Sequence, residues 1–259
     1  MMDTDQPVTS QEGDRLGFAS IAEHLAKAIA GQRSPNGFVF AIEGRWGSGK
    51  TTLINLTIEA LKKLGPAGPE IVTFSPWLVG DREELLRSLF DELAGAAIKI
   101  DPVIKPEDVP ASKRSRFGGI FDKQEQWRLS EKERFRKSLG PKLRAFGSFA
   151  GTLGKLTRTA EAFGLPLAGF ASAALERSGE FAQTMIAEQP TSKRKAELVK
   201  ELARLSRGIV VFIDDLDRLE PREVSEVLRL IRAVADFPNI IYVLSYDPRI
   251  VADTVSKAL

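Results

Sequence analysis

The sequence feature that most constrains the fold is a glycine-rich turn at residues 44–51, with the sequence Gly-Arg-Trp-Gly-Ser-Gly-Lys-Thr. A short apolar run at residues 38–42 precedes this turn, and an amphipathic pattern at residues 51–64 follows it. Such glycines let the backbone curl so that successive N–H groups hold phosphate oxygens at the start of a helix, whose N-terminus also attracts anions. The order of strand, glycine loop and helix therefore predicts a phosphate-binding loop. The alternative is a turn that only caps the helix.

Short apolar runs and helical patterns alternate along much of the chain. The expected strands are residues 38–42, 70–77, 208–213 and 239–245. The expected helices are residues 16–30, 51–64, 82–98, 192–207 and 222–237. The first helix is expected to bury Leu16, Ile21, Leu25 and Ile29, which recur at helical spacing. This alternation indicates an α/β fold with a parallel sheet that is covered on both faces.

The glycine-rich turn also predicts the role of each residue within it. We expect Lys50 to reach the β- and γ-phosphates and the Thr51 hydroxyl to bind Mg²⁺. The expected nucleotide contacts are Gly44, Arg45, Trp46, Gly47, Ser48, Gly49, Lys50, Thr51 and Thr52.

A second candidate element is the acidic sequence that ends the apolar run at residues 208–213. Asp214 is placed to hold Mg²⁺ through water, because carboxylates at the end of a parallel strand reach the edge of the sheet where phosphates bind. Asp215 is the first candidate for positioning the attacking water, and Asp217 is the second. The alternative is that these residues form an acidic helix N-terminus.

The run at residues 239–245 supplies a third candidate element. It ends in Ser245, followed by Tyr246 and Asp247. Ser245 is a candidate for contact with the γ-phosphate, and Asp247 is another. The alternative for Asp247 is that it starts the next helix together with Pro248.

Composition excludes several kinds of chemistry. The chain has no cysteine, which excludes disulfides, thiolate metal sites and cysteine nucleophiles. It has a single histidine, His24, so a histidine-based triad or a histidine-rich metal site is not expected. Chemistry is therefore expected to depend on carboxylates, lysine, arginine, hydroxyls and backbone amides. The net charge of +2 is too small to argue that the chain as a whole binds nucleic acid.

Residues 101–190 interrupt the alternation of strands and helices. Residues 113–144 carry a net charge of +7, with aromatic residues interleaved, and residues 145–187 are mostly small and apolar. This basic segment is expected to be a solvated face, a surface for lipid or protein, or, as a third alternative, a nucleic-acid contact. The longest uncharged run, residues 162–175, is too short to span a membrane. The N-terminus does not resemble a secretory signal, so a cytoplasmic location is expected, with peripheral membrane association as an alternative.

Taken together, the motifs resemble those of the KAP family of P-loop NTPases. The resemblance rests on residues 44–51, on Phe-Ser-Pro-Trp at 74–77, on Asp-Asp-Leu-Asp-Arg at 214–218, on Tyr-Asp at 246–247 and on Asp-Arg-Leu-Gly-Phe at 14–18. It implies a three-layer P-loop NTPase of the additional-strand class, with strand order 5-1-4-3-2. Many members of this family carry membrane-spanning helices between the P-loop and the acidic strand.

The chain departs from this pattern in two places, and both affect its expected domains. The insertion at residues 101–190 is expected to be helical but not membrane-spanning. It divides an NTPase domain into residues 1–100 and residues 191–259. The fifth strand, beside the P-loop strand, is missing, so the chain is either part of a longer protein or has that edge covered by another element. A C-terminal lid with an arginine would also be absent.

These features favour an Mg²⁺-dependent ATPase that acts as a conformational switch or an assembly module. ATP is preferred to GTP because no Asn-Lys-x-Asp motif follows the acidic strand. Trp46 and Arg15 are candidates for contacts with the base or the phosphates, with packing as the alternative. A protein partner or a second copy is expected, together with a membrane surface at residues 113–187 as a further option. The resemblance implies a role in regulated assembly, including bacterial defence. The alternatives are a non-hydrolysing nucleotide-dependent scaffold, a membrane-surface interaction protein and a small-molecule kinase.

Overall fold

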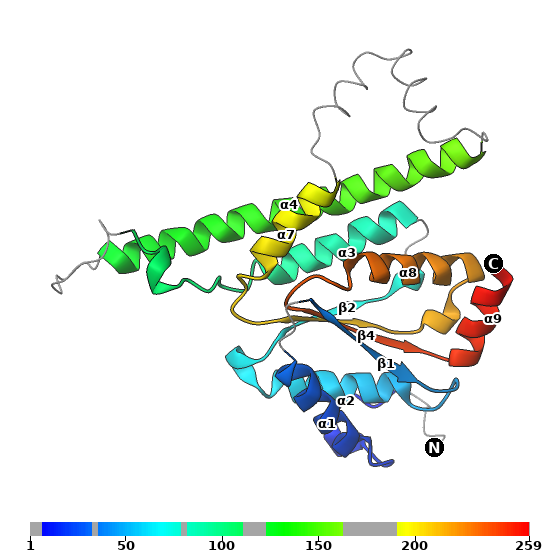
Figure 1. Ribbon diagram of the computed structural model, residues 1–259. Coiled ribbons are helices and arrows are strands. Elements are labelled where there is room, and N and C mark those ends of the chain that lie inside the picture. Colours follow the sequence, from blue (N-terminus) through cyan, green and yellow to red (C-terminus); the bar gives the residue numbers. More distant parts are fainter. Residues whose placement is uncertain (1–6, 33–35, 79–81, 111–122, 163–190, 259) are drawn as a thin grey trace.

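The computed structural model describes residues 7–32, 36–78, 82–110, 123–162 and 191–258 (Figure 1). Its centre is a four-stranded parallel sheet with the order β1-β4-β3-β2. The strands are β1 (Phe38–Glu43), β2 (Glu70–Phe74), β3 (Ile209–Ile213) and β4 (Ile240–Tyr246). Over the part of the chain that the structure describes, this is the expected strand order 5-1-4-3-2 without its fifth strand. The α/β class and the four strands are therefore confirmed.

The helices alternate with the strands as expected. They are α1 (Phe18–Gly31), α2 (Lys50–Lys62), α3 (Arg82–Ala97), α4 (Lys123–Ala162), α7 (Thr191–Leu202), α8 (Pro221–Val234) and α9 (Pro248–Ala258). Short 3₁₀ turns are η1 (Gln11–Gly13), η2 (Gly65–Ala67), η3 (Pro76–Leu78), η4 (Pro106–Asp108) and η6 (Leu216–Arg218).

The register of the sheet brings the ends of three strands together. β4 lies between β1 and β3, with Ser245 opposite Ile42 on one side and Leu244 opposite Ile213 on the other. All three strands are parallel, so the loops that follow them meet at the edge of the sheet formed by the carboxyl ends of the strands. This edge is where the glycine-rich turn and the acidic residues are found.

The open edge of the sheet at β1 is apolar. Within the described residues, β1 pairs with β4 alone, and no strand lies along its other side. Phe38 and Val39 are exposed, and the rings of Phe38 and Phe40 lie 4.8 Å apart between centroids. The described part of this edge therefore presents apolar side chains to solvent.

Helices α1 and α2 cover one face of the sheet (Figure 1). Apolar residues of both helices pack against alternate residues of β3 and β4, including Val210, Phe212, Ile241 and Val243. The other residues of these strands face away from α1 and α2. The period of two along each strand thus separates two hydrophobic clusters.

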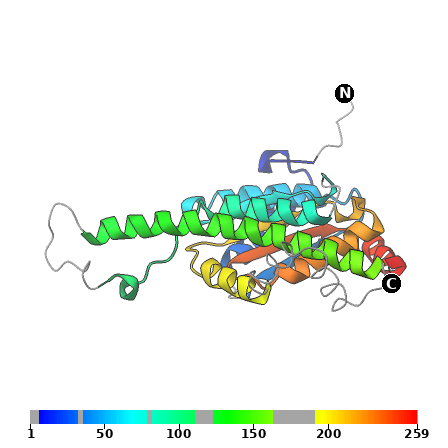
Figure 2. The ribbon, with the colours of Figure 1, turned by 90° about the horizontal axis from the view of Figure 1, so that it is seen from above.

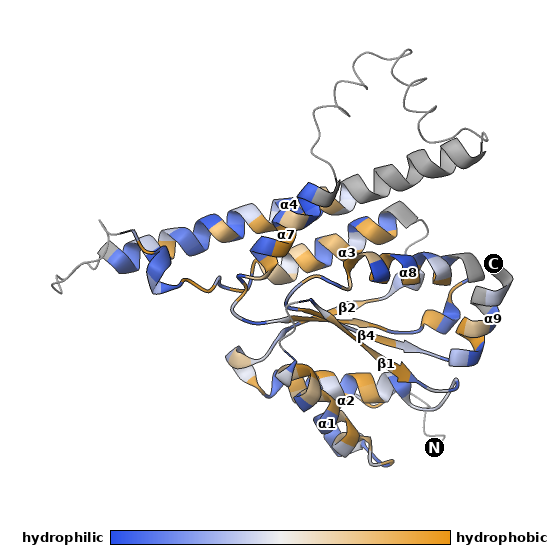
Figure 3. Cartoon of the chain, in the orientation of Figure 1, coloured by the Kyte–Doolittle hydropathy of each residue, from blue (hydrophilic) through white to orange (hydrophobic). Residues whose placement is uncertain are grey.

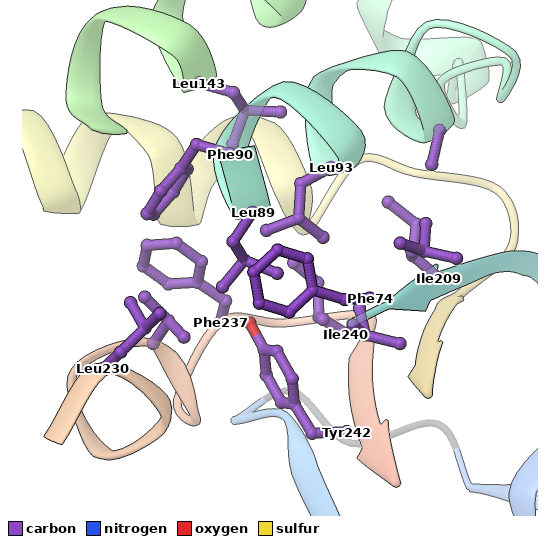
Figure 4. Packing of buried hydrophobic residues seen from close by; sticks show 14 of the residues in the cluster. Phe74, Leu89, Phe90, Leu93, Leu143, Ile209, Leu230, Phe237, Ile240 and Tyr242 are labelled. Carbon is purple, nitrogen blue, oxygen red and sulfur yellow. The ribbon is translucent and has the colours of Figure 1, made fainter. Parts of the chain in front are cut away.

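The opposite face of the sheet is covered by α3 and α8, with α4 and α7 outside them (Figures 1 and 2). Tyr242, Phe74, Leu89 and Phe237 belong to the larger cluster on this face, where their side chains meet (Figure 4). Figure 3 shows hydrophobic residues along the strands and mainly hydrophilic ones along the first half of α4. The result is the expected three-layer architecture with an additional helical layer.

Two expectations about local structure are wrong. The first helix buries Ala22, Ala26 and Ile29, but Leu16 and Ile21 are exposed. The small alanines permit close packing, and the helix begins only at Phe18, so Leu16 lies outside it. The second expected strand ends at Phe74, not at residue 77, because Pro76 cannot donate to a strand ladder and starts η3 instead.

The insertion contains a long helix that packs on α3. Four residues of α4 are buried against it: Phe135, Leu139, Leu143 and Phe146. Gly147 permits a close approach, since a Cβ atom there would lie 2.6 Å from the Cβ of Phe90. The prediction that the insertion is helical is therefore confirmed for residues 123–162, and residues 135–146 of this helix pack on protein. The expected continuation of the insertion at residues 163–190 lies outside the described residues.

Several basic residues of the insertion have acidic partners. Lys132 Nζ lies 2.8 Å from Asp101 Oδ2, and Arg136 pairs with the other oxygen of Asp101. Lys142 lies 3.0 Å from Glu201. These pairs join α4 to the segments before and after it. These basic side chains of α4 therefore form ion pairs that hold the helix against its neighbours. The earlier part of the basic segment, residues 113–122, lies outside the described residues.

The insertion and the helix that follows it, α7, begin and end together at a narrow neck, formed by residues 101–103 and 204–206. The Val103 N–H donates to the Arg204 carbonyl at 2.6 Å, and the Ser206 N–H donates to the Asp101 carbonyl at 3.0 Å. Pro102 and Leu205 form an antiparallel bridge between these bonds. The insertion together with α7 thus leaves and returns at one point, just before β3.

None of the helices in the described residues has a stretch that is long and apolar enough to cross a membrane.

Candidate functional site

The glycine-rich turn lies between β1 and α2, at the sheet edge where β3 and β4 also end. Its backbone is left-handed at Gly47 (φ 75°) and at Gly49 (φ 87°), a conformation that disfavours side chains. At Gly49, a Cβ atom would also lie 2.8 Å from a ring carbon of Phe18. The Gly44 N–H donates to the Tyr246 carbonyl at 3.2 Å. The turn is therefore attached to β4 at its start and covered by an aromatic ring near its end.

Lys50 begins α2, and its side chain lies within the turn. Its Nζ donates to the carbonyl oxygens of Gly44 at 3.0 Å and Arg45 at 3.4 Å. Asp217 Oδ2 is 3.7 Å from the same atom, and both side chains are buried. The ammonium group thus lies at the centre of the turn, where a phosphate would require positive charge.

Asp214 follows β3 directly. Val210 and Phe212 on this strand face α1 and α2, and continuing the alternation directs Asp214 toward the same side of the sheet. Its Oδ1 accepts a hydrogen bond from the Asp215 N–H at 2.9 Å. A carboxylate is therefore held at the sheet edge on the side where α2 begins.

Asp215 is constrained by its backbone and by a neighbouring arginine. It is left-handed, with φ 60°, which is uncommon for a residue with a side chain. Its Oδ2 lies 3.1 Å from an Nη atom of Arg218. Burial and the charge of Asp214 raise the pKa of Asp215, while Arg218 opposes the shift. Its carboxylate is therefore engaged by Arg218.

Asp217 lies in η6, and its carboxylate is buried. One of its oxygens approaches Lys50. Its other oxygen, Oδ1, makes no hydrogen bond to any described residue. Of the two candidates for positioning water, Asp217 is thus the one beside Lys50, and Asp215 is the one paired with Arg218.

Ser245 and Asp247 follow one another closely but differ in their surroundings. Ser245 is fully buried near the end of β4, and its hydroxyl makes no hydrogen bond within the described part of the chain. Asp247 is also buried, but its Oδ1 accepts a hydrogen bond from the Arg249 N–H at 2.9 Å at the start of α9. The geometry supports the helix-start alternative for Asp247, whereas the hydroxyl of Ser245 is buried and has no partner among the described residues.

The chemistry of this site fits Mg²⁺ and a nucleoside triphosphate. The Thr51 hydroxyl and the Asp214 carboxylate are the residues that would hold Mg²⁺, which prefers oxygen ligands. Lys50 supplies positive charge for the phosphates. Buried polar groups normally have hydrogen-bond partners, so the unpaired oxygens of Asp217 and Ser245 indicate a place where a polar ligand belongs.

Comparison with known protein families is consistent with this geometry. The model described as the KAP family P-loop domain matches residues 18–259. The chain belongs to the KAP family. The predicted resemblance and the P-loop NTPase fold class are confirmed, and KAP membership indicates that the chain binds nucleotide.

A curated relative of this KAP chain is the phage T7 exclusion protein of Escherichia coli (strain K12). The two are 29% identical over 256 residues, which cover 98% of this chain and 32% of the relative. The chain therefore spans about a third of the length of that relative.

Sequence reasoning missed how the N-terminal residues of this KAP chain contact the site. The Thr52 hydroxyl, an expected nucleotide contact, accepts a hydrogen bond from the Val8 N–H at 3.2 Å. Phe18 packs on Gly49, and Trp46 is 78% exposed at the outer part of the turn. Phe18 lies in the segment that resembles the family, but no local pattern indicates its contact with a glycine 31 residues later. Only the tertiary arrangement reveals it.

Proposed function

We propose that this KAP domain binds ATP with Mg²⁺, hydrolyses it and thereby changes conformation. The observation that supports this most directly is the pair of buried, unpaired oxygens on Asp217 and Ser245. Leaving a buried polar group unpaired costs about 1–3 kcal/mol. The Ser245 hydroxyl can donate to a phosphate oxygen, and the free Asp217 oxygen can accept from a water molecule, so the two groups together favour a phosphate with an attacking water beside it. The lysine between the turn and η6 favours an anionic ligand.

In this proposal each residue has a defined part. Backbone N–H groups of residues 44–51 and the Lys50 ammonium hold the phosphates. Thr51 and Asp214 hold Mg²⁺, which when bound offsets phosphate charge. Ser245 donates to the γ-phosphate.

Asp217 is assigned the water-positioning role ahead of Asp215. Asp217 is buried beside Lys50, whereas the carboxylate of Asp215 is paired with Arg218. In either case the carboxylate orients the attacking water and accepts its proton.

The same contacts provide a mechanism for switching. Before the nucleotide binds, Lys50 donates to two carbonyl oxygens of the turn and lies near Asp217. A triphosphate competes for the same ammonium group and so releases these partners. Asp217 belongs to η6, which packs against η3 and β4. Rearrangement at Lys50 therefore reaches several elements of the sheet edge, which is what a nucleotide-dependent assembly module requires.

The name of the relative supports a biological role. That relative is a phage exclusion protein, and the alignment with it covers nearly all of this chain. We propose that the ATPase cycle of this chain serves bacterial defence through a protein partner or a second copy.

The proposed activity is tested by measuring phosphate release from MgATP. Wild-type protein is compared with Lys50→Ala, with the double variant Asp214→Ala and Asp215→Ala, and with Asp217→Ala. The control is Lys62→Ala, which removes an exposed lysine from the last turn of the same helix. We expect turnover in wild type and in the control, and a loss of at least about a hundredfold in the others. Equal phosphate release from all of them would sink the proposal.

A second candidate is a scaffold that binds nucleotide without hydrolysing it. The ion pair between Asp215 and Arg218 favours this alternative, because it engages one of the two candidate acids. Such a scaffold could recruit a protein or a lipid surface through residues 113–187. Tight ATP binding without phosphate release in wild type supports the scaffold. Vesicle cosedimentation lost on deleting residues 113–187 supports the membrane surface, and binding that survives the deletion contradicts it.

A further inference from the structure

Arg218 lies at the rim of the nucleotide site, in the short turn η6 that follows β3. This turn consists of Leu216, Asp217 and Arg218. A 3₁₀ turn has about three residues, so its side chains point in three different directions. The side chain of Leu216 is buried in the hydrophobic core, and the carboxylate of Asp217 is buried beside Lys50. The third direction leads outward, and the side chain of Arg218 is 55% exposed.

Arg218 is paired with Asp215, three residues earlier. One of its Nη atoms lies 3.1 Å from Asp215 Oδ2. The turn itself is closed by the backbone, because the Arg218 N–H donates to the Asp215 carbonyl at 3.1 Å. An ion pair with a half-exposed arginine contributes little to stability. The pair of side chains is therefore not what holds η6 in place.

The carboxylate of Asp215 lies close to the phosphate position. Burial and the charge of Asp214 raise the pKa of Asp215, whereas Arg218 and, more weakly, Lys50 lower it. Both cations are thus within electrostatic range of the same carboxylate. Arg218 and Lys50 therefore border the acidic end of the site together.

A bound triphosphate offers the guanidinium group a stronger partner than Asp215. The γ-phosphate carries more charge than one carboxylate, and arginine binds phosphates through paired hydrogen bonds. Asp217 Oδ2 is 3.7 Å from the Nζ atom of Lys50, which is expected to hold the γ-phosphate. Arg218 is the chain neighbour of Asp217, and Cα atoms of such neighbours are about 3.8 Å apart. A rotation of the long arginine side chain is therefore the movement that the exchange of partners requires.

We propose that Arg218 is a catalytic residue that leaves Asp215 and binds the γ-phosphate when MgATP enters the site. The proposal rests on the ATP hydrolysis proposed above and deepens it, because it names an arginine of this chain that acts on the transferred phosphoryl group. The ion pair with Asp215 is then the resting arrangement, which keeps the arginine at the rim until a triphosphate arrives.

During hydrolysis the arginine acts on the charge of the transition state. The oxygen of the attacking water forms a bond to the γ-phosphorus, while the bond from this phosphorus to the bridging oxygen breaks and its electron pair leaves with ADP. One proton of the water passes to the carboxylate of Asp217. Arg218 donates hydrogen bonds to the phosphoryl oxygens as their charge redistributes. An arginine in this role accelerates phosphoryl transfer by about a thousandfold or more.

The first test separates a contact in the transition state from binding in the ground state. MgADP is titrated with and without aluminium fluoride, which together with ADP imitates the transferred phosphoryl group. The proteins are wild type, Arg218→Ala and the control Arg232→Ala, which removes an exposed arginine from the last turn of α8. We expect Arg218→Ala to bind MgADP like wild type and to bind the aluminium fluoride complex at least about a hundredfold more weakly. The control should behave like wild type with both ligands.

The second test uses the ion pair itself. Asp215→Asn removes the charge that holds Arg218 and keeps the arginine. Its kcat for MgATP should be that of wild type, and its KM should fall severalfold because ATP no longer competes with Asp215 for the guanidinium group. Arg218→Ala should instead lower kcat about a thousandfold. A purely structural ion pair predicts equal effects for the two variants, so a similar loss of kcat in both would overturn the proposal.

The outcomes separate this proposal from the one on which it rests. If wild type neither releases phosphate nor binds ADP more tightly with aluminium fluoride, the proposed ATPase activity fails, and the role of Arg218 fails with it. If wild type hydrolyses ATP and Arg218→Ala does so equally fast, the role of Arg218 alone is refuted. The same holds if aluminium fluoride tightens ADP binding equally in the two proteins.

Discussion

The hydroxyl of Tyr242 provides a sharp test of the packing around the sheet. Tyr242 is fully buried in the middle of β4, and its hydroxyl makes no hydrogen bond to a described residue. It points among apolar side chains that include Phe74, Leu89 and Phe237 (Figure 4). Burial raises the pKa of Tyr242, so the group stays neutral and keeps its proton. Replacing this residue by phenylalanine removes the oxygen and keeps the ring.

The expected magnitude follows from the unpaired group. A buried polar group without a partner costs about 1–3 kcal/mol, and the phenylalanine ring fits the space that the tyrosine ring already occupies. We therefore expect Tyr242→Phe to raise the free energy of unfolding by about 1 kcal/mol. For a chain of this size, that corresponds to a rise of about 2–4 °C in Tm.

The assay is urea and thermal unfolding followed by circular dichroism. Tyr246→Phe is the matched control on the same strand, because the Tyr246 hydroxyl donates to Glu43 Oε1 at 2.8 Å. Removing this hydroxyl should lower stability by about 0.5–1 kcal/mol, so the two substitutions are expected to have opposite signs. A loss of stability in Tyr242→Phe as large as that in Tyr246→Phe would refute the reasoning, because it would mean that the Tyr242 hydroxyl has a partner.

Two further predictions concern the insertion. Asp101 is paired with two basic side chains of α4, chiefly through its hydrogen bond from Lys132, and this lowers the pKa of Asp101. The stability that this carboxylate contributes is therefore complete above its ordinary pKa and is lost as the pH falls through the lowered pKa. Asp101→Asn should cost up to about 1 kcal/mol at neutral pH and progressively less as the pH is lowered into the acid range. Gly147→Ala should destabilise the protein by about 1–3 kcal/mol, because the added Cβ overlaps Phe90. Its control is Gly95→Ala on α3, which should stabilise the protein by about 0.5–1 kcal/mol because a Cβ there meets nothing within 4 Å.

Both predictions are checked by urea unfolding, at several pH values for the first. A constant difference between wild type and Asp101→Asn across the acid range would show that the ion pairs do not contribute. If Gly147→Ala is as stable as Gly95→Ala, α4 does not approach α3 as closely as described.

The loop and the acidic strand end could be predicted from sequence because their chemistry is local. Residues 44–51 carry their own glycines, lysine and threonine, and the apolar runs on either side identify the strand and the helix. The order of the strands could be expected from the family resemblance. The parallel class followed from the alternation of short apolar runs with helices.

Other features depend on tertiary contacts that no local pattern encodes. The buried face of α1 is built from Ala22 and Ala26, which carry little hydrophobic signal, so the larger Leu16 and Ile21 misdirected the prediction. The distinction between Asp215 and Asp217 depends on a left-handed backbone and on the positions of Arg218 and Lys50. Adjacent acidic residues have the same appearance in sequence, although their surroundings differ.

The neck at residues 101–103 and 204–206 fixes the points at which the insertion and α7 leave and rejoin the NTPase core, although α4 also packs on α3. Because the two sides of the neck are bridged to one another, an insertion of a different length can begin and finish there without changing the distance between β2 and β3. The neck precedes β3, whereas the phosphate-binding loop acts at the opposite ends of the strands. Exchange of this segment during evolution, including replacement by membrane-spanning helices, is therefore compatible with an unchanged nucleotide site. In protein engineering, the same neck is the place to graft a different helical segment onto this NTPase core, provided that the segment also covers the face of α3 that α4 buries.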